Sequence, residues 1–414
     1  MNSVDDLRNK LQEAGAQRLA IVRFDDRLKS SLEEFQWLAD ELIDYPDQLE
    51  HEGVFLGLGE RSGVLMGAFL HWTHRGPGAG GVRLWPYHKL RDYLTDGLRL
   101  AVGMGRKNAL AGLWWGGGKG VICRPQDAPY QDGSWRQDVY RDFGDFVTSL
   151  DGCYVTAEDA GTTPKDMAEV FRRTRFTTCI PPELGGSGNP SGPTALGVLR
   201  ALQALAEHLG HESLKGLSVA IQGAGQVGSR LARYLLDEGV GRLLVSDLDE
   251  SRVPKGAEFE EPDKILSAKV DLLSPCALGG VLNESSIPTI QARGVCGAAN
   301  NQLRDPVKDA ERLSLRGIIY VPDYVANRMG IVNCADEQSG RLESDPRIQR
   351  HLSFDWPEGV YQTVKRVLQK ARENGTSPEA ESVRLADKAA LQPHPLWGHR
   401  PNEIAKAVWR KFKG

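Results

Sequence analysis

The sequence has few cysteines, and no two of them stand at a short spacing. Six occur among the 414 residues: Cys123, Cys153, Cys179, Cys276, Cys296 and Cys334. None belongs to a CxxC pair or has a histidine at the spacing of metal ligands, so the sequence predicts no metal site. No base that could activate a cysteine is recognisable beside any of them. We therefore expect reduced, mostly buried thiols without a catalytic role.

The chain also lacks an excess of basic charge, a long apolar run and a targeting signal. The formal net charge of −4 and the isoelectric point near 6.2 offer no basic surface for nucleic acid or anionic lipid. No apolar run approaches the roughly 20 residues that span a bilayer. The opening MNSVDDLRNKLQEAGAQRL mixes charged and apolar residues, unlike a secretory signal. These absences favour a cytoplasmic protein that binds neither nucleic acid nor membrane.

The apolar content of 40% is typical of globular domains, and at about 150 residues per domain the length of 414 predicts two or three of them. Residues 1 to about 50 look helical and amphipathic, with SLEEFQWLADELI as the clearest stripe. Residues 54–70 predict a β-hairpin, and residues 90–112 predict a helix. A stretch rich in Gly, Pro and Ser at 181–194 predicts a linker before a region of alternating strands and helices.

Two lysines, Lys107 and Lys119, bracket a glycine-rich run, and Lys119 directly follows the three glycines 116–118. Glycine allows positive φ and close approach of a backbone or a ligand, so GGGKG could present an ammonium group from a bend. A phosphate loop of the form GxxxxGK followed by Ser or Thr is disfavoured, because Leu113 and Gly120 stand at two of its required positions. Taken alone, the run favours a surface loop with a solvated lysine.

A dinucleotide-binding fingerprint is the strongest local motif. Gly223, Gly225 and Gly228 form GxGxxG directly after the apolar strand at 217–221 and directly before an amphipathic helix. Asp247 lies 19 residues after Gly228, at the end of the next apolar run. A carboxylate there accepts hydrogen bonds from the ribose hydroxyls and repels a 2′-phosphate, so the motif predicts NAD rather than NADP.

Together the motifs resemble the Glu/Leu/Phe/Val amino-acid dehydrogenases, nearest to the leucine dehydrogenase branch, over about residues 50 to 400. The matching segments are GPGAGGVRLWPY, VGMGRKNALAGLWWGGGKGVI, YVTAEDAGT, IQGAGQVG, LLSPCALGGVLN, GAANNQLRDP and YVPDYVANRMGIVNCADE. The resemblance implies an α/β fold with a substrate and oligomerisation domain at 1–190, a Rossmann-type NAD-binding domain at 191–354, and a helical segment at 355–414 that returns to the first domain. It also implies a homo-oligomer that deaminates an L-amino acid oxidatively and reversibly, giving a 2-oxo acid and ammonia.

The resemblance assigns roles residue by residue. Lys107 matches the lysine that binds the substrate α-carboxylate, Lys119 the lysine that activates water, and Asp159 the aspartate that exchanges protons with the amino group. A lysine acts as a base near neutral pH only when burial or a nearby cation lowers its pKa, which two lysines in one closing cleft would provide. The remaining substrate positions are Ala79, Gly80, Gly81, Ala157, Ile331 and Cys334. The cofactor positions are Thr194, Gly223, Gly225, Gln226, Val227, Gly228, Asp247, Cys276, Ala277, Asn301 and Asn327.

The chain departs from the family pattern at positions near the expected site. Ala79 replaces a usual Leu, which would deepen the pocket, and the uncharged pocket positions disfavour glutamate. The usual Leu-Pro becomes the pair Trp114–Trp115, a usual Asp becomes Trp72, and the usual NAGG becomes NRMG at 327–330. These bulky residues either reshape the pocket or pack between elements. The expected substrate is therefore a hydrophobic amino acid, with aromatic and bulky side chains included. The alternatives are a catalytically silent NAD- or metabolite-binding relative and a reductase of another imine or carbonyl.

Overall fold

The structure, a computed structural model, describes residues 3–129, 132–337, 340, 342 and 344–413. The chain divides into two compact units. Unit 1 contains residues 1–189, 334–341 and 387–414, and unit 2 contains residues 190–333 and 342–386. The predicted return to the first domain at residue 355 is therefore too early. Residues 342–386 group with unit 2 because α12 (Val360–Asn374) packs against α6 (Ser191–His208).

The first fifty residues of unit 1 are only partly helical. Helices α1 (Val4–Glu13) and α2 (Gln36–Ile43), with a short 3-10 turn η1 (Glu33–Phe35), agree with the prediction. Between them, β1 (Arg18–Phe24) and β2 (Arg27–Ser30) form an antiparallel hairpin that the sequence reading missed. Residues 19–22 are all buried, and a continuous apolar run of this kind does not distinguish a strand from a buried helix.

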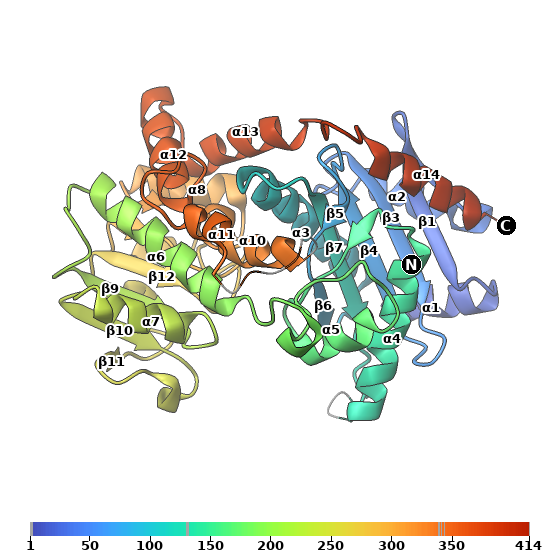
Figure 1. Cartoon of the computed structure of the whole chain (residues 1–414), viewed down its shortest axis with the longest axis horizontal. Coiled ribbons are helices and arrows are strands. Elements are labelled where there is room, and N and C mark those ends of the chain that lie inside the picture. Colours follow the sequence, from blue (N-terminus) through green and yellow to red (C-terminus); the bar gives the residue numbers. More distant parts are fainter. Residues whose placement is uncertain (1–2, 130–131, 338–339, 341, 343, 414) are drawn as a thin grey trace. The chain divides into compact units, whose positions relative to one another are not determined.

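The sheet of unit 1 has the strand order β2-β1-β3-β4-β7-β5-β8 among the described residues, with β6 also paired to β7. Its further strands are β3 (His51–Leu58), β4 (Leu65–His71), β5 (Gly78–Ala79), β6 (Val82–Trp85), β7 (Gly116–Cys123) and β8 (Tyr154–Val155). The hairpin predicted at 54–70 is confirmed as β3 and β4, and the helix predicted at 90–112 is α3 (Leu90–Leu110). Helix α3 packs across β7 and β4, as Figure 1 shows.

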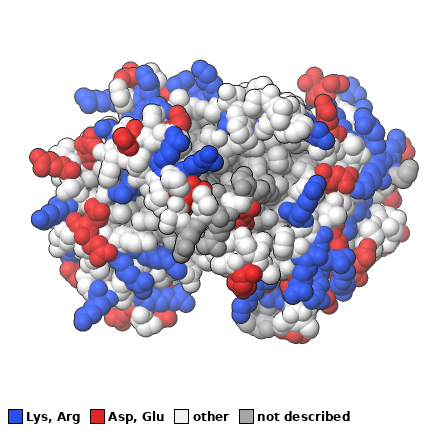
Figure 2. Space-filling view, in the orientation of Figure 1, with Lys and Arg blue, Asp and Glu red and all other residues white. Residues whose placement is uncertain are grey.

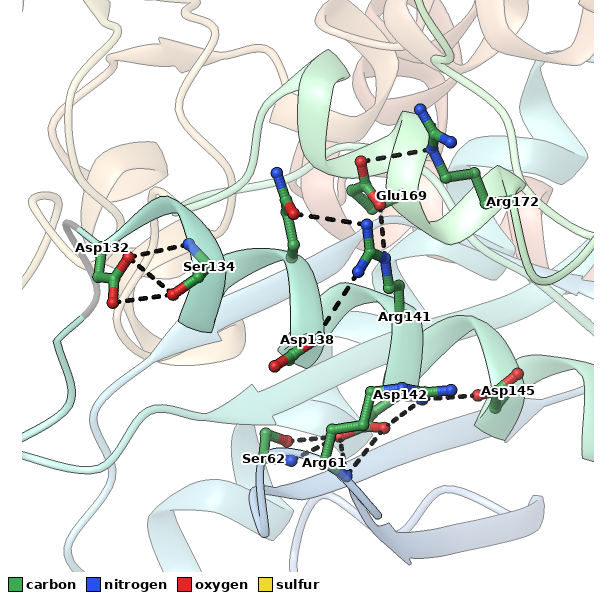
Figure 3. Close-up of polar contacts among 11 residues, drawn as sticks. Arg61, Ser62, Asp132, Ser134, Asp138, Arg141, Asp142, Asp145, Glu169 and Arg172 are labelled. Atoms are coloured by element: carbon green, nitrogen blue, oxygen red, sulfur yellow. Dashed lines mark hydrogen bonds and ion pairs between the residues drawn. The ribbon is translucent and has the colours of Figure 1, made fainter.

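A network of ion pairs fixes α4 (Gly133–Ser149) to the β3–β4 turn and to α5 (Pro164–Phe171). Asp142 of α4 is buried and accepts hydrogen bonds from the backbone N–H groups of Arg61 and Ser62, and Arg141 pairs with Glu169 of α5 at 2.9 Å. Figure 3 shows these side chains pointing toward one another from the two helices and the turn. The side chains of Arg61 and Arg141 are each 35% exposed, so these ion pairs position the helices more than they add stability.

Two further elements, of which the second is C-terminal, complete unit 1. A turn η2 (Pro182–Leu184) follows α5, and α14 (Arg400–Lys411) lies against β1 and β3. Trp409 of α14 meets Phe24 edge to face, with ring centroids 5.1 Å apart. The core of this unit gathers apolar residues from α1, α2, α3 and the strands β1, β3 and β4.

Unit 2 is built on a parallel sheet with the order β11-β10-β9-β12-β13-β14 among the described residues. In chain order this is 3-2-1-4-5-6, the arrangement of doubly wound dinucleotide-binding domains. The strands are β9 (Ser218–Gln222), β10 (Arg242–Ser246), β11 (Glu258–Phe259), β12 (Leu272–Pro275), β13 (Gly294–Val295) and β14 (Ile319–Tyr320). The predicted strand, helix and strand at 217–249 are confirmed as β9, α7 (Gly228–Asp237) and β10.

The remaining elements of unit 2 connect or cover these strands. They are η3 (Glu250–Arg252), η4 (Ile265–Ser267), η5 (Ile287–Thr289), α8 (Pro306–Leu315), α9 (Asp323–Ala326), α11 (Pro346–His351) and α12. Helices α10 (Met329–Asp336) and α13 (Pro378–Ala390) contain the points at which the chain leaves this unit.

The surface charge agrees with the composition. On the face drawn in Figure 2, Lys and Arg side chains are interspersed with Asp and Glu over both units. In the described part of the chain, no helix is both long and apolar enough to cross a membrane.

Candidate active site

The glycine-rich lysine segment is a buried strand of the sheet, not the bend or loop that its glycines predicted. Every residue of β7 is buried, and the strand pairs with β4 on one side and with β5 and β6 on the other. None of residues 116–118 has a positive φ. A Cβ on Gly118 would lie 2.5 Å from the carbonyl carbon of Gly78, and one on Gly117 would lie 2.5 Å from the oxygen of Ala101. The glycines therefore allow β5 and α3 to approach β7 closely.

Lys119 of β7, which is buried, forms an ion pair with Asp159, which follows β8 and has a side chain that is 14% exposed. The Nζ of Lys119 lies 2.8 Å from Oδ2 of Asp159, and the lysine is 2% exposed. Burial lowers the pKa of Lys119, although Asp159 opposes this effect. Burial acts to raise the pKa of Asp159, but the cations Lys119 and Arg83 outweigh it and hold that pKa well below its usual range. Asp159 is therefore ionised at neutral pH, and Lys119 loses its proton more readily than an exposed lysine.

Arg83 is a further member of this group that the sequence reading missed. Its Nε lies 3.3 Å from Oδ2 of Asp159, and its Nη1 donates to both oxygens of Asp96 at 2.9 and 3.0 Å. The Tyr87 hydroxyl also donates to Asp96. Asp159 and Asp96 raise the pKa of Arg83 against the effect of burial, so the guanidinium stays charged. The sequence signal that could have identified Arg83 is a single cationic residue between two apolar residues, Val82 and Leu84, which are buried in β6.

The backbone of residues 79–81 passes directly beside the lysine–aspartate pair. A Cβ on Gly80 would lie 1.9 Å from the Gly118 oxygen, and one on Gly81 would lie 2.8 Å from Cβ of Asp159. The Tyr154 hydroxyl donates to the Gly80 carbonyl at 2.7 Å and fixes this segment. The structure thus brings three predicted site residues, Gly80, Gly81 and Asp159, together with Lys119.

Lys107 lies in the last turn of α3 and is buried. The next residue, Asn108, donates from Nδ2 to the carbonyl of Ala79 at 3.2 Å and to that of Gly116 at 2.8 Å. A Cβ on Gly105, which lies two residues before Lys107, would be 3.2 Å from Cα of Gly117. The end of α3 that carries Lys107 is therefore fixed to β5 and to the beginning of β7, the strand that carries Lys119.

Among the predicted side-chain pocket positions, Ala79 and Ala157 are buried in unit 1, next to β7 and β8. Cys334 is also in unit 1 and Ile331 is in unit 2, since the chain crosses within α10. Glu158 was not predicted, yet its Oε2 is buried and has no hydrogen-bond partner among the described residues. Burial, then the nearby carboxylates, raise the pKa of Glu158 to about 7.

The bulky departures of unit 1 have packing partners there. Trp114 is 40% exposed; the Arg75 guanidinium lies 4.2 Å from its ring centroid and His394 lies against the ring at 5.2 Å. Trp115 is buried. Trp72 has a φ of 39° and stacks on His71 at 4.4 Å. Packing of Trp114 against the segment that contains His394 is the simpler of the two interpretations that the sequence left open.

The glycine fingerprint in unit 2 has the geometry that its motif requires. Gly223 has a φ of 99°, and its Cβ position would lie 2.7 Å from that of Ala277. A Cβ on Gly228 would lie 1.9 Å from the Gly223 oxygen, whereas one on Gly225 would meet nothing within 4 Å. The first glycine therefore makes the turn, the second leaves the backbone open to a ligand, and the third lets α7 pack closely. Gln226 and Val227 complete the approach to the N-terminus of α7.

Asp247 follows β10 and lies beside this loop. Its Oδ2 accepts a hydrogen bond from the N–H of Ala224 at 2.8 Å, and its Oδ1 accepts one from Asp249 at 3.1 Å. Arg252 approaches Oδ1 to 3.6 Å. The carboxylate is thus positioned at the fingerprint loop, as the motif predicted, with a cation close to it.

The other predicted cofactor residues gather at the carboxyl edge of the parallel sheet or beside it. Cys276 and Ala277 follow β12, and Asn301 follows β13 with a φ of 52°. Asn327 donates from Nδ2 to the carbonyl of Ala298 and to Oδ1 of Asn300, both at 3.0 Å. Thr194 belongs to α6 and lies beside Gly330, since a Cβ on Gly330 would be 2.7 Å from Oγ1 of Thr194. In open parallel sheets this edge is where ligands bind.

The NRMG departure also has partners inside its own unit. Arg328 is fully buried, and its Nη2 donates to the carbonyl of Glu358 and to Oγ1 of Thr363. A Cβ on Gly197 of α6 would lie 2.7 Å from Cγ of Met329, so the methionine fills space that this glycine leaves. Arg328, directly before α10, therefore contacts α12, and Met329, at the start of α10, lies against α6.

Within the described residues, one group has ligand atoms close enough for a metal: Glu52, His74 and His399, all within 4.8 Å. His399 Nε2 lies 3.0 Å from Oε1 of Glu52, but the two histidine rings stack at 3.9 Å with an interplanar angle of 19°. Nearly parallel rings do not direct their lone pairs at one ion. The group joins β3 to the beginning of α14.

A lysine–aspartate pair beside a glycine-lined backbone, in a chain that also has a dinucleotide fingerprint, is the combination expected of a nucleotide-dependent oxidoreductase. Residues 65–176 match the family model described as "Glu/Leu/Phe/Val dehydrogenase, dimerisation domain", and residues 185–252 and 241–391 match that of "Glutamate/Leucine/Phenylalanine/Valine dehydrogenase". The chain belongs to the Glu/Leu/Phe/Val dehydrogenase family. It is an amino-acid dehydrogenase, an oxidoreductase acting on CH–NH2 groups with a pyridine nucleotide.

Individual relatives agree with this assignment. The chain is 37% identical over 353 residues to leucine dehydrogenase of Thermoactinomyces intermedius, covering 84% of this chain and 93% of that one. It is 39% identical over 360 residues to valine dehydrogenase of Streptomyces coelicolor, covering 85% and 95%. Among solved structures, L-tryptophan dehydrogenase from Nostoc punctiforme matches with a TM-score of 0.67 and 33% identity, covering 82% and 96%.

Proposed function

We propose that the protein catalyses the reversible, NAD-dependent oxidative deamination of a hydrophobic L-amino acid, with bulky and aromatic side chains in its range. The ion pair of Lys119 and Asp159, supported by Arg83, is the observation that carries this proposal. The predicted pocket positions Ala79 and Ala157 are small and uncharged, which favours an apolar side chain. The similar proteins named as leucine, valine and tryptophan dehydrogenases act on such amino acids.

In this proposal each charged residue has one task. Lys107 binds the substrate carboxylate, and the backbone at Gly80 and Gly81 holds the substrate against β7. A nicotinamide held by the proposed cofactor residues would supply the acceptor for the hydride of the substrate Cα, and water would then add to the imine left behind. Lys119 takes the proton of that water, which its lowered pKa allows. Asp159, ionised because of its two cations, exchanges a proton with the amino group before ammonia leaves.

NAD is the proposed nucleotide because Asp247 lies beside the fingerprint loop, where it would accept hydrogen bonds from the ribose. The remaining proposed cofactor residues are Thr194, Cys276, Ala277, Asn301 and Asn327. The description of residues 65–176 as a dimerisation domain supports a homo-oligomer. Light scattering on the purified protein measures that state directly.

The test is NADH formation from NAD with a panel of L-amino acids: leucine, valine, phenylalanine, tryptophan and glutamate. We expect turnover with at least one apolar substrate and none with glutamate. Lys119→Met should abolish turnover, while Lys165→Met, which replaces an exposed lysine of the same unit, should leave it unchanged. Binding of NAD by calorimetry without turnover of any substrate would contradict the proposal and support a silent binding relative.

A further inference from the structure

Two cysteines from distant parts of the sequence lie in direct contact. Cys179 follows the end of α5, and Cys334 is in α10, where the chain has just re-entered unit 1. Their sulfur atoms are 2.6 Å apart, and the residues are 1% and 2% exposed. A disulfide bond is about 2.05 Å long, so a small displacement would bring the sulfurs to bonding distance. Among the described cysteines, this is the pair whose sulfurs contact each other.

The surrounding structure holds both cysteines in place. Cys179 has a φ of 60°, a left-handed conformation that is unfavourable for a residue other than glycine. Its N–H donates to Oε2 of Glu337 at 2.5 Å, and the N–H of Ser187 donates to the other oxygen of that carboxylate. Glu337 lies three residues after Cys334, so it ties α10 to the segment of Cys179. The neighbouring Thr178 is held by the Thr156 carbonyl at 2.9 Å.

The position of the pair gives a cross-link a route to influence turnover. Cys179 lies ten residues before the first crossing of the chain between its units, at Asn189 and Pro190. Cys334 directly follows the second crossing, and it is also a proposed pocket position. At present polar contacts of Glu337 join the two segments, and these can exchange with water. A covalent bond would remove that freedom from both segments.

We propose that Cys179 and Cys334 are a redox pair that a hydroperoxide converts to an intramolecular disulfide, and that the cross-link slows the dehydrogenase. One thiol attacks the peroxide oxygen and becomes a sulfenic acid, while the O–O bond breaks and hydrogen peroxide yields one water. The second thiol then attacks the sulfenic sulfur, forms the S–S bond and releases a second water. The two thiols lose two electrons, which the peroxide accepts. A small oxidant is required because both sulfurs are buried.

The effect on turnover rests on the proposed function, but the formation of the bond does not. We expect the oxidised protein to turn over its substrate at least about fivefold more slowly, the lower end of usual couplings between a regulatory site and an active site. A thiol reductant should restore the rate.

The experiment treats the reduced full-length protein with hydrogen peroxide, alkylates the free thiols, and maps non-reduced peptides by mass spectrometry beside NADH assays. A cross-linked peptide joining residues 179 and 334 is expected in the wild type and in Cys153→Ser, which lacks a buried thiol elsewhere in unit 1. Cys179→Gly, which suits the left-handed backbone, should keep its activity, form no cross-link and resist inhibition.

Each other result overturns a defined part of the inference. Recovery of Cys179 and Cys334 as separate alkylated or over-oxidised residues would refute the pair. A complete cross-link with unchanged turnover would refute its influence on the enzyme, as would equal inhibition of Cys179→Gly. Absence of turnover in the reduced protein would instead count against the proposed function, and the peptide map would still decide whether the bond forms.

Discussion

Replacement of Asp159 by asparagine should move the pH dependence of the enzyme toward acid while it lowers the rate. The substitution keeps the size of the side chain and removes the charge that lies 2.8 Å from Nζ of Lys119. At that distance and an effective dielectric constant of about 20, the attraction is about 6 kcal/mol. Relaxation and entering water reduce this energy, and we expect the pKa of Lys119 to fall.

The direction of the pKa change of Lys119 follows from the protonation state that each neighbouring charge stabilises. Asp159 stabilises protonated Lys119, whereas burial and Arg83 favour the neutral form. Without the carboxylate, Lys119 loses its proton at lower pH. The ascending limb of kcat/KM, which reports the base of the free enzyme, should therefore shift downward. The maximum rate should nevertheless fall by about 10²–10⁴, because proton exchange with the amino group loses its carrier.

The assay is initial NADH formation with the best amino acid of the panel over the pH range in which the protein stays folded. Asp145→Asn is the matched control, since it removes a carboxylate of unit 1 that pairs with Arg61 and Arg173 instead. Its profile should superimpose on that of the wild type. If the limb of Asp159→Asn stays in place or moves upward, Lys119 is not the titrating base and the charge argument fails.

Three further substitutions, one of them with a matched control at Gly103, test other parts of the structure. The pKa of Glu158 is raised to about 7 by burial and nearby carboxylates, so its ionisation costs stability increasingly from its unfolded pKa of about 4.3 up to about 7. Glu158→Gln should therefore raise Tm more near pH 8 than near pH 5, and an equal shift at both would contradict the pKa. Gly80→Ala should prevent folding of unit 1, as measured by circular dichroism, because its Cβ would lie 1.9 Å from the Gly118 oxygen. The control Gly103→Ala on α3 places its Cβ in open space and should add about 0.5–1 kcal/mol to the free energy of unfolding. Asp247→Ala should raise the KM for NAD about tenfold or more with little change in kcat, since the loss of one charged hydrogen-bond acceptor costs about 1.5–3 kcal/mol; an unchanged KM would remove Asp247 from the cofactor site.

The parts of the fold that the sequence predicted well are those whose signals are local. The fingerprint of unit 2 combines an apolar strand, three glycines and an amphipathic helix within one short segment, and each piece appears where expected. The strand β7 is the opposite case. Its glycines predict a loop from the local sequence alone, and only the contacts with β4, β5 and α3 explain why they lie in a buried strand. The β1–β2 hairpin was missed for a related reason, because a run buried on both faces has no alternation to recognise.

The candidate site divides in the same way. Lys107, Lys119 and Asp159 were predicted through resemblance to a family, because the residues alone favoured a loop and a turn. Arg83 was missed because its partner Asp159 is 76 residues away, and no local pattern records such a pair. Glu158 was missed although it is the direct neighbour of Asp159, since only burial distinguishes it from a solvated carboxylate.

Most of the bulky departures from the family pattern have packing partners within their own units, and this changes where substrate preference should be sought. Trp114 is paired with Arg75 and His394, and Met329 fills the space beside Gly197. A large residue that is compensated in this way need not reduce the pocket. Ala79 is different, because it replaces a larger side chain and lies on β5, the strand directly beside β7. The larger residues therefore indicate altered packing, whereas Ala79 indicates space for a larger substrate. In the amino-acid panel, we expect faster turnover of substrates with long or aromatic side chains than of valine.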